Sequence, residues 1–171
     1  AERVHVDEAV RRNLFARALK AGVTPSPELG ALVDELLAKA VLGALGLARK
    51  AGHVVLGAAK VDSAVRSGRA LMVLHATDGS ADGVRKIGQA RRATAHLGGP
   101  HIPAYKLFSE PELSLAMGGT NVIHAAVLAG DTGRTVLRRA VALDRYRGGS
   151  PDDLMLVAAT GDHDDAAEEM E

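Results

Sequence analysis

The sequence predicts an α/β fold: a three-layer α/β/α sandwich with a four-stranded, mostly parallel or mixed sheet, plus an N-terminal helical segment. Three observations predict it. Short apolar runs alternate with helical segments four times between positions 53 and 146. Glycine punctuates the junctions, as at Gly57 and Gly68. Hydrophobic residues make up 47% of the 171 positions but aromatic residues only 2%, so Leu, Val and Ala must build the core.

The first 50 residues read as one short strand and two helices. Positions 2–6, ERVHV, are strand-like, and a helix follows in which Asp7 is a plausible N-cap and Gly22 a C-cap. One face of this helix is apolar, and the other carries Arg12, Arg17 and Lys20. Ser26 and Pro27 then suit the start of a long helix that ends near Lys50.

Four strand–helix units follow in the rest of the chain. Ser80 is expected to cap the second of their helices, Ser109 and Glu112 to form a capping box for the third, and Asp131 or Thr132 to cap the last. The expected strands are 53–56, 70–76, 102–108 and 121–129, and the expected helices are 58–67, 81–97, 110–118 and 131–146.

These elements suggest three parts: a first segment over 1–38, an α/β/α domain over 39–148, and an acidic tail over 149–171. The tail holds eight acidic residues and no Lys or Arg, and we expect it to be disordered, although its apolar stretch at 154–159 could form a short docking segment. The chain has no Met at its start, and we interpret it as a fragment or a trimmed protein.

The zero net charge conceals a strong asymmetry. Residues 1–151 carry 21 basic and 13 acidic side chains, a charge of +8. A basic body with an acidic tail is typical of a nucleic-acid binder whose tail can fold back, and a solubilising tail on a mildly basic protein is the alternative. We expect the cations to form one continuous surface with Gly57 near its middle.

The sequence lacks the motifs that several classes of function require. There is no cysteine, which fits a reducing, cytoplasmic location, and no apolar run approaches the roughly 20 residues that span a bilayer. No phosphate-binding loop, dinucleotide fingerprint, zinc-protease motif or nucleophile elbow occurs. We therefore predict no catalytic residues, no metal site and no cofactor. His75 and His124 fit core strands better than a ligand set, and Asp78 fits a turn better than a catalytic role.

Cations and glycines remain as candidate binding residues. Arg49 and Lys50 close the long helix, and Gly57 and Lys60 open the next, where free backbone amides and a lysine make an anion site. Because single-strand readers stack bases on exposed rings, this aromatic-poor chain is expected to contact phosphates and backbone shape in structured RNA.

The stretches LGLARKAGHVVLGAAKVDSAVRSGRALMVLHATDGS and YKLFSEPELSLAMGGTNVIHAAV, with their element order and glycine turns, cover much of positions 40–148. This region resembles the bacterial YlxQ-like branch of the kink-turn-binding ribosomal protein superfamily, named after the archaeal protein L-seven-Ae. The resemblance implies an α/β/α fold and RNA binding at the turn beginning at Gly57 and at the loop Gly118, Gly119, Thr120 and Asn121. The segment before it, with ERVHV and RRNLFARALK, resembles the C-terminal end of YlxR-type RNA-binding proteins.

One motif departs from the superfamily. Kink-turn binders carry Gly-x-Asn-Glu-x-x-Lys at the helix start, and here Ala59, Lys60 and Ser63 occupy the Asn, Glu and Lys positions. Ala59 offers no hydrogen bond through its side chain, and Lys60 replaces an acceptor with a donor. The resemblance therefore implies phosphate contacts rather than base-specific ones at this turn.

The resulting prediction is a non-enzymatic protein that binds structured RNA, such as rRNA or RNA of the translation or processing machinery. The ribosome and RNA-processing proteins are further candidate partners, and no membrane contact is expected. Its predicted RNA-binding residues are Arg12, Arg17, Lys20, Arg49, Lys50, Gly57, Lys60, Ser63, Gly118, Gly119, Thr120 and Asn121. The alternatives are a protein-interaction or ribosome-assembly adaptor without direct RNA readout, and a substrate-binding domain separated from its enzyme.

Overall fold

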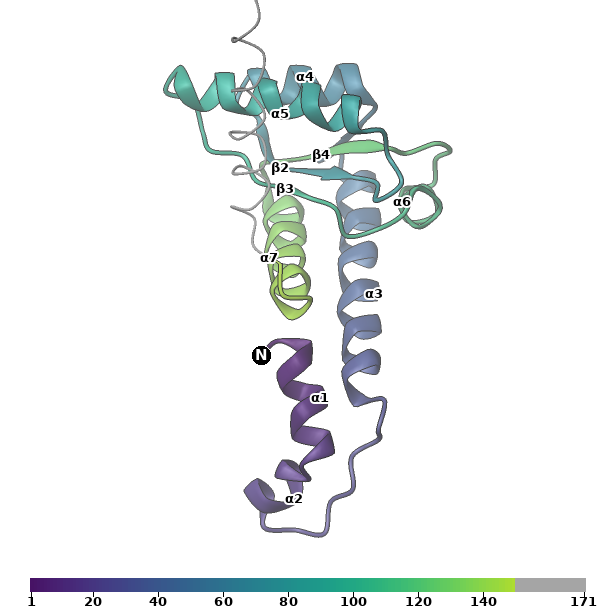
Figure 1. Cartoon of the computed structure of the whole chain (residues 1–171). Helices are drawn as coiled ribbons and strands as arrows, with labels where there is room; N and C mark the ends of the chain where they lie inside the picture. Colours follow the sequence, from purple (N-terminus) through teal and green to yellow (C-terminus); the bar gives the residue numbers. More distant parts are fainter. Residues whose placement is uncertain (150–171) are drawn as a thin grey trace, which may run out of the picture.

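The computed structural model describes residues 1–149, so the predicted tail from position 150 onward lies outside the described residues. Eleven elements form within them (Figure 1). They are α1 (Arg3–Arg11), α2 (Leu14–Leu19), α3 (Leu29–Lys50), β1 (Val54–Leu56), α4 (Ala58–Arg66), β2 (Ala70–His75), α5 (Ala81–His96), β3 (Ala104–Tyr105), α6 (Glu110–Met117), β4 (His124–Leu128) and α7 (Asp131–Tyr146).

The predicted α/β/α layering is confirmed. Helices α4 and α5 cover one face of the sheet around a core that includes Val61, Val73 and Ile87. Helices α3, α6 and α7 cover the other face around a larger core that includes Leu45, Phe108 and Leu143 (Figure 1). Side chains of β2 and β4 alternate between these two cores, as the period of two in a strand requires.

The sheet is mixed, which is one of the two arrangements that the sequence left open. Its strand order is β1-β4-β2-β3, with β4 antiparallel to both of its neighbours and β3 parallel to β2. The β-α alternation predicts the order of elements along the chain, but not that β4 inserts between β1 and β2. Strand β3 is also shorter than expected at both ends, and its late start fits Pro103, which has no N–H to donate to a strand ladder.

The N-terminal expectations were partly wrong. Positions 3–6 belong to helix α1, with Glu2 as its N-cap, rather than to a strand, since a lone strand would have no partner while a helix packs along α3. The single helix expected between Asp7 and Gly22 breaks at Asn13, which takes a left-handed conformation with φ of 52°. Asp7 therefore lies inside α1 and makes no N-cap.

Of the caps predicted for the last three helices of the chain, two are confirmed and one is wrong. The Ser80 side chain accepts a hydrogen bond from the Gly83 backbone N–H at the start of α5, and Ser109 and Glu112 form the capping box of α6. Neither Asp131 nor Thr132 caps α7, because Gly130 occupies the N-cap position and Asp131 is already helical.

Helix α3 runs unbroken for 22 residues through Gly43, Gly46 and the boundary predicted near Lys39. Helices α1 and α7 lie one after the other along the same side of it (Figure 1). The end of α7 is fastened there, since the Tyr146 hydroxyl donates to the Gly30 carbonyl at 2.9 Å. The division into segments 1–38 and 39–148 stays a prediction.

Candidate nucleic-acid interface

The turn between β1 and α4 depends on one exposed glycine, Gly57. Gly57 is exposed and has a φ of 90°, a conformation that L side chains rarely adopt. Its N–H donates to the His124 carbonyl at 3.0 Å, which ties the turn to the first residue of β4. A Cβ built on Gly57 would meet nothing within 4 Å. The glycine is therefore required by backbone conformation, while the space in front of it stays empty.

The first turn of α4 differs from that of the two neighbouring helices. No side chain caps α4 and no acidic residue lies in its first turn, whereas α5 has a Ser80 cap and Asp82, and α6 has its capping box with Glu110 and Glu112. The backbone N–H groups at a helix start have no partner within the helix, and the helix dipole adds partial positive charge there. Among these three helix starts, α4 is the one suited to an external anion.

Lys60 adds a full positive charge to this turn. Its side chain is exposed in the first turn of α4, and no carboxylate among residues 1–149 pairs with it. Ser63, one turn further on, is also exposed. At the far end of the same helix, Arg66 is neutralised by Asp62 at 2.8 Å. The free charge of α4 is therefore concentrated at its N-terminal end.

The loop after α6 lies against the same turn. Gly118 ends α6 in a left-handed conformation, and Asn121 is left-handed too, with φ values of 61° and 56°. A Cβ built on Gly119 would lie 3.8 Å from the Leu56 side chain, immediately before Gly57. The exposed Gly118, Thr120 and Asn121 thus lie beside the α4 start and extend one surface.

Two other groups of predicted residues lie apart from this surface. Arg49 and Lys50 are exposed at the end of α3, and the whole of β1 separates them from Gly57. Arg12, Arg17 and Lys20 belong to α1, α2 and their flanks, at the opposite end of α3 from the sheet (Figure 1).

The expected single cationic surface around Gly57 is therefore wrong. It fails because α3 holds the first segment away from the sheet, and because many cations already have acidic neighbours. Within residues 1–149, nine cations form ion pairs with carboxylates: Arg3, Arg11, Arg12, Lys39, Arg66, Arg85, Lys86, Arg134 and Arg147.

Two buried histidines lie beneath this region. His75 and His124 face each other across β2 and β4, with their Nδ1 atoms 2.8 Å apart. Burial lowers the pKa of His75 to about 3, the charge of a protonated His124 adds to the effect, and burial also lowers the pKa of His124. The Nε2 atom of His75 is buried with no hydrogen-bond partner among the described residues. Both histidines thus lie in core strands, as expected, but one ring nitrogen of the pair is left without a partner. The only local signal for the pair was that each of the apolar runs LMVLHA and NVIHAA contains one histidine.

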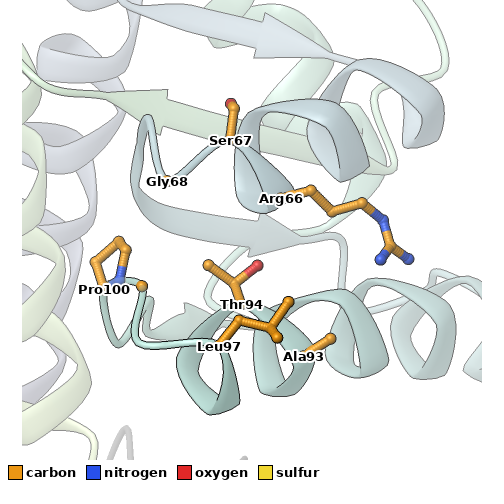
Figure 2. A pocket seen from close by; sticks show the side chains of 8 residues that line it. Arg66, Ser67, Gly68, Ala93, Thr94, Leu97 and Pro100 are labelled. Atoms are coloured by element: carbon orange, nitrogen blue, oxygen red, sulfur yellow. The ribbon is translucent and has the colours of Figure 1, made fainter.

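A hollow of about 410 Å³ lies at the C-terminal ends of α4 and α5 (Figure 2), and its lining offers little to a ligand. The hydroxyls of Ser67 and Thr94 in its wall already donate to helix carbonyls. Arg66 points away from Pro100 and is paired with Asp62. Within residues 1–149, no three His, Cys, Asp or Glu side chains are placed to hold a metal ion, and no helix is both long and apolar enough to span a bilayer.

No protein-family model matches the sequence, and no curated protein matches it. Among solved structures, an RNA-binding protein of 15.5 kD from Giardia lamblia superposes with a TM-score of 0.50 and 20% identity, over 64% of this chain and 89% of that one. The chain shares its fold with an RNA-binding protein. A protein of unknown function from Bacillus halodurans superposes with a TM-score of 0.52 and 21% identity, over 59% and 96% of the two chains.

Proposed function

We propose that this protein binds structured RNA without catalysis, through phosphate and shape contacts centred on the start of α4. The observation that supports this most is the combination of an uncapped helix start, an unpaired Lys60 and the adjoining 118–121 loop on one exposed surface. The Giardia neighbour, an RNA-binding protein of the same fold, adds support. The RNA belongs, in this proposal, to the bacterial translation or processing machinery in the cytoplasm, as the YlxQ and YlxR resemblances suggest.

The chemistry of the surface favours backbone contacts over base reading. Backbone amides and one ammonium group are donors that match phosphate oxygens. Ala58 and Ala59, the exposed residues between Gly57 and Lys60, have no side-chain group for base edges. Arg49 and Lys50 lie beyond β1 and would contact a more distant part of a folded RNA.

An acidic substitution in the first turn of α4 tests this proposal. Ala59→Asp is expected to weaken RNA binding at least fivefold, because the carboxylate would take the amides and repel phosphate. The same change is expected to stabilise the fold by about 0.3–1 kcal/mol, through the helix dipole. Filter binding to a panel of structured RNAs and urea unfolding measure the two effects.

Ala81→Asp is the matched control, since Ala81 is also exposed in the first turn of a helix, α5, which already holds Ser80 and Asp82. It adds the same charge beside a capped helix start, and we expect RNA affinity to change less than twofold. Equal losses in the two variants would show that only overall charge matters, and unchanged binding in Ala59→Asp would contradict the proposed site.

The adaptor alternative also has an observation in its favour. Within residues 1–149, helices α1 and α2 have no buried residue. Six large hydrophobic side chains of the first 36 residues are more than a third exposed: Val4, Leu14, Leu19, Val23, Leu32 and Leu36. A protein partner retained by the chain after nuclease treatment, together with no measurable RNA affinity, would favour this function.

A further inference from the structure

Helix α3 has an apolar face that nothing in the described chain covers. At 100° per residue, Leu32, Leu36, Gly43 and Leu47 fall within about 60° of one another on the side opposite the buried Val41. The three leucines are 48%, 58% and 62% exposed. Helices α1 and α7 both pack on another side of α3 (Figure 1). A helix that is apolar on its outer face as well as its inner one fits a second packing partner.

The spacing along this face is symmetric about its centre. Leu32 and Leu36 are four residues apart, Gly43 comes seven later, and Leu47 four after that. When two copies of α3 pair antiparallel about a two-fold axis near residues 39 and 40, Leu32 meets Leu47 of the second copy and Leu36 meets Gly43 of the second copy. A face that complements itself in this way is what a two-fold interface needs.

The outer face of α3 also has hollows that could receive Leu32 and Leu36 of the second copy. A Cβ built on Gly43 meets nothing within 4 Å, so Gly43 forms a notch opposite Leu36 of the other copy. A hollow of about 210 Å³ beside Leu47, between α3 and α7, lies opposite Leu32 of the other copy. The polar side chains that line this hollow already have partners. The Thr132 hydroxyl contacts His53, and the Thr135 hydroxyl donates to the Asp131 carbonyl. The Asp131 carboxylate pairs with Arg134, and Arg139 donates to the Ala40 carbonyl. An apolar side chain is the suitable occupant.

Charges along the helix are compatible with this orientation. The antiparallel arrangement brings Glu28 of each copy next to Lys50 of the other, which gives an opposite-charge pair at both ends. The two Lys39 side chains approach each other at the centre, where each is already paired with its own Glu35 at 2.7 Å. A parallel arrangement would instead place like charges side by side along the whole helix.

We propose that two copies of this chain associate through the outer faces of their α3 helices, antiparallel, with Leu36 of each seated over Gly43 of the other. The face is about 33 Å long and one helix wide, roughly 350 Å² per copy. Because stable interfaces bury about 800 Å² per partner, this dimer is a weak, transient one. This surface is separate from the start of α4, so a failed dimer leaves the RNA proposal standing.

Disulfide trapping tests the orientation cleanly because the chain contains no cysteine. Leu36→Cys and Gly43→Cys chains, mixed and oxidised, are expected to form the mixed disulfide. In the antiparallel dimer the two copies of residue 36 lie about 10 Å apart along the helix axis, beyond the roughly 7 Å limit for a disulfide. Leu36→Cys chains that crosslink with themselves in preference, or an absence of any crosslink, would overturn the proposal.

Sedimentation of the uncrosslinked protein tests the association itself. The wild type is expected to shift from monomer to dimer between about 10 μM and 0.5 mM. Leu36→Glu is expected to stay monomeric with an unchanged circular dichroism spectrum. Leu97→Glu, at an 84% exposed leucine after α5, is the control that keeps the dimer. A wild type that is monomeric at every concentration, as expected if this face binds only another protein, would overturn the proposal.

Discussion

Single residues at the start of α4 decide whether an anion can bind there. Gly57 supplies a backbone conformation that other residues rarely adopt, Ala58 and Ala59 leave the amides uncovered, and Lys60 adds a charge that no described carboxylate neutralises. All four could be found in the sequence, because glycine, a missing cap and a lone lysine are local features. The ion pairs that neutralise Arg12 and Arg66 are also local, at helical spacings of four residues, and could have been anticipated.

The paired histidines give the fold a specific dependence on pH. One Nδ1 must donate and the other accept, so the pair holds only while at least one ring is neutral. In the unfolded chain a histidine has a pKa near 6.5, whereas the pKa of His75 in the fold is about 3. Between these values the unfolded chain binds more protons, so stability falls as the pH falls from 6.5 towards 3. The loss from His75 alone reaches about 2 kcal/mol at pH 5.

Replacing both histidines tests this dependence. In the double variant His75→Leu, His124→Leu, the decrease in the free energy of unfolding between pH 7.5 and pH 5 is expected to be smaller by about 2 kcal/mol than in the wild type. Urea unfolding at each pH measures it. His96→Leu, which replaces an exposed histidine at the end of α5, is expected to keep the wild-type decrease. The same decrease in all three proteins would rule out the buried pair as its cause.

At the scale of elements, sequence patterns predicted the helices and strands of the sandwich but not their spatial relations. Every strand and helix after position 53 lies within a few residues of its expected range, because apolar periodicity and caps are local signals. The insertion of β4 between β1 and β2 and the path of α1 along α3 depend on long-range packing. The distance between the first segment's cations and Gly57 follows from that packing. Local patterns could not predict it, so one cationic surface was expected where the predicted residues form three separate groups.

Arg147 shows how such long-range packing is fixed. Its guanidinium binds both carboxylate oxygens of Asp34 on α3, at 2.9 and 2.8 Å, and the Leu107 carbonyl at 2.7 Å. These hydrogen bonds also hold the pKa of Asp34 below its usual value. One side chain thereby joins the end of α7, the N-terminal half of α3 and the segment after β3.

Arg147→Lys keeps the charge but loses the forked geometry. We expect the free energy of unfolding in urea to fall by about 1–2 kcal/mol, because a lysine cannot satisfy Asp34 and Leu107 together. Arg145→Lys, at an exposed position on α7, is the control and is expected to change stability by less than about 0.5 kcal/mol. A loss of the same size in both variants would show that Arg147 has no special role.

At the scale of the whole molecule, the charge is divided between a basic body and an acidic C-terminal segment. Residues 1–151 carry +8, and the eight acidic residues after them balance that charge. In a solution of low ionic strength, a tethered polyanion competes with RNA for the cations of the body.

Deleting residues 152–171 is therefore expected to raise RNA affinity, several-fold at 50 mM salt and little at 300 mM. Filter binding of the shortened and full chains to the same RNA measures the difference. A variant in which the eight acidic residues become Asn or Gln keeps the length of the segment and is expected to behave like the deletion. Affinity that stays unchanged in both would leave the segment as a solubilising tail only.

The salt dependence of RNA binding tests the central claim, that this protein binds structured RNA through phosphate contacts, most directly. With about four to six phosphates neutralised, a plot of the logarithm of the association constant against the logarithm of salt concentration is expected to be linear with a slope near −4 to −6. Ala59→Asp is expected to make the slope shallower by about 1. A flat plot for the wild type would contradict the claim.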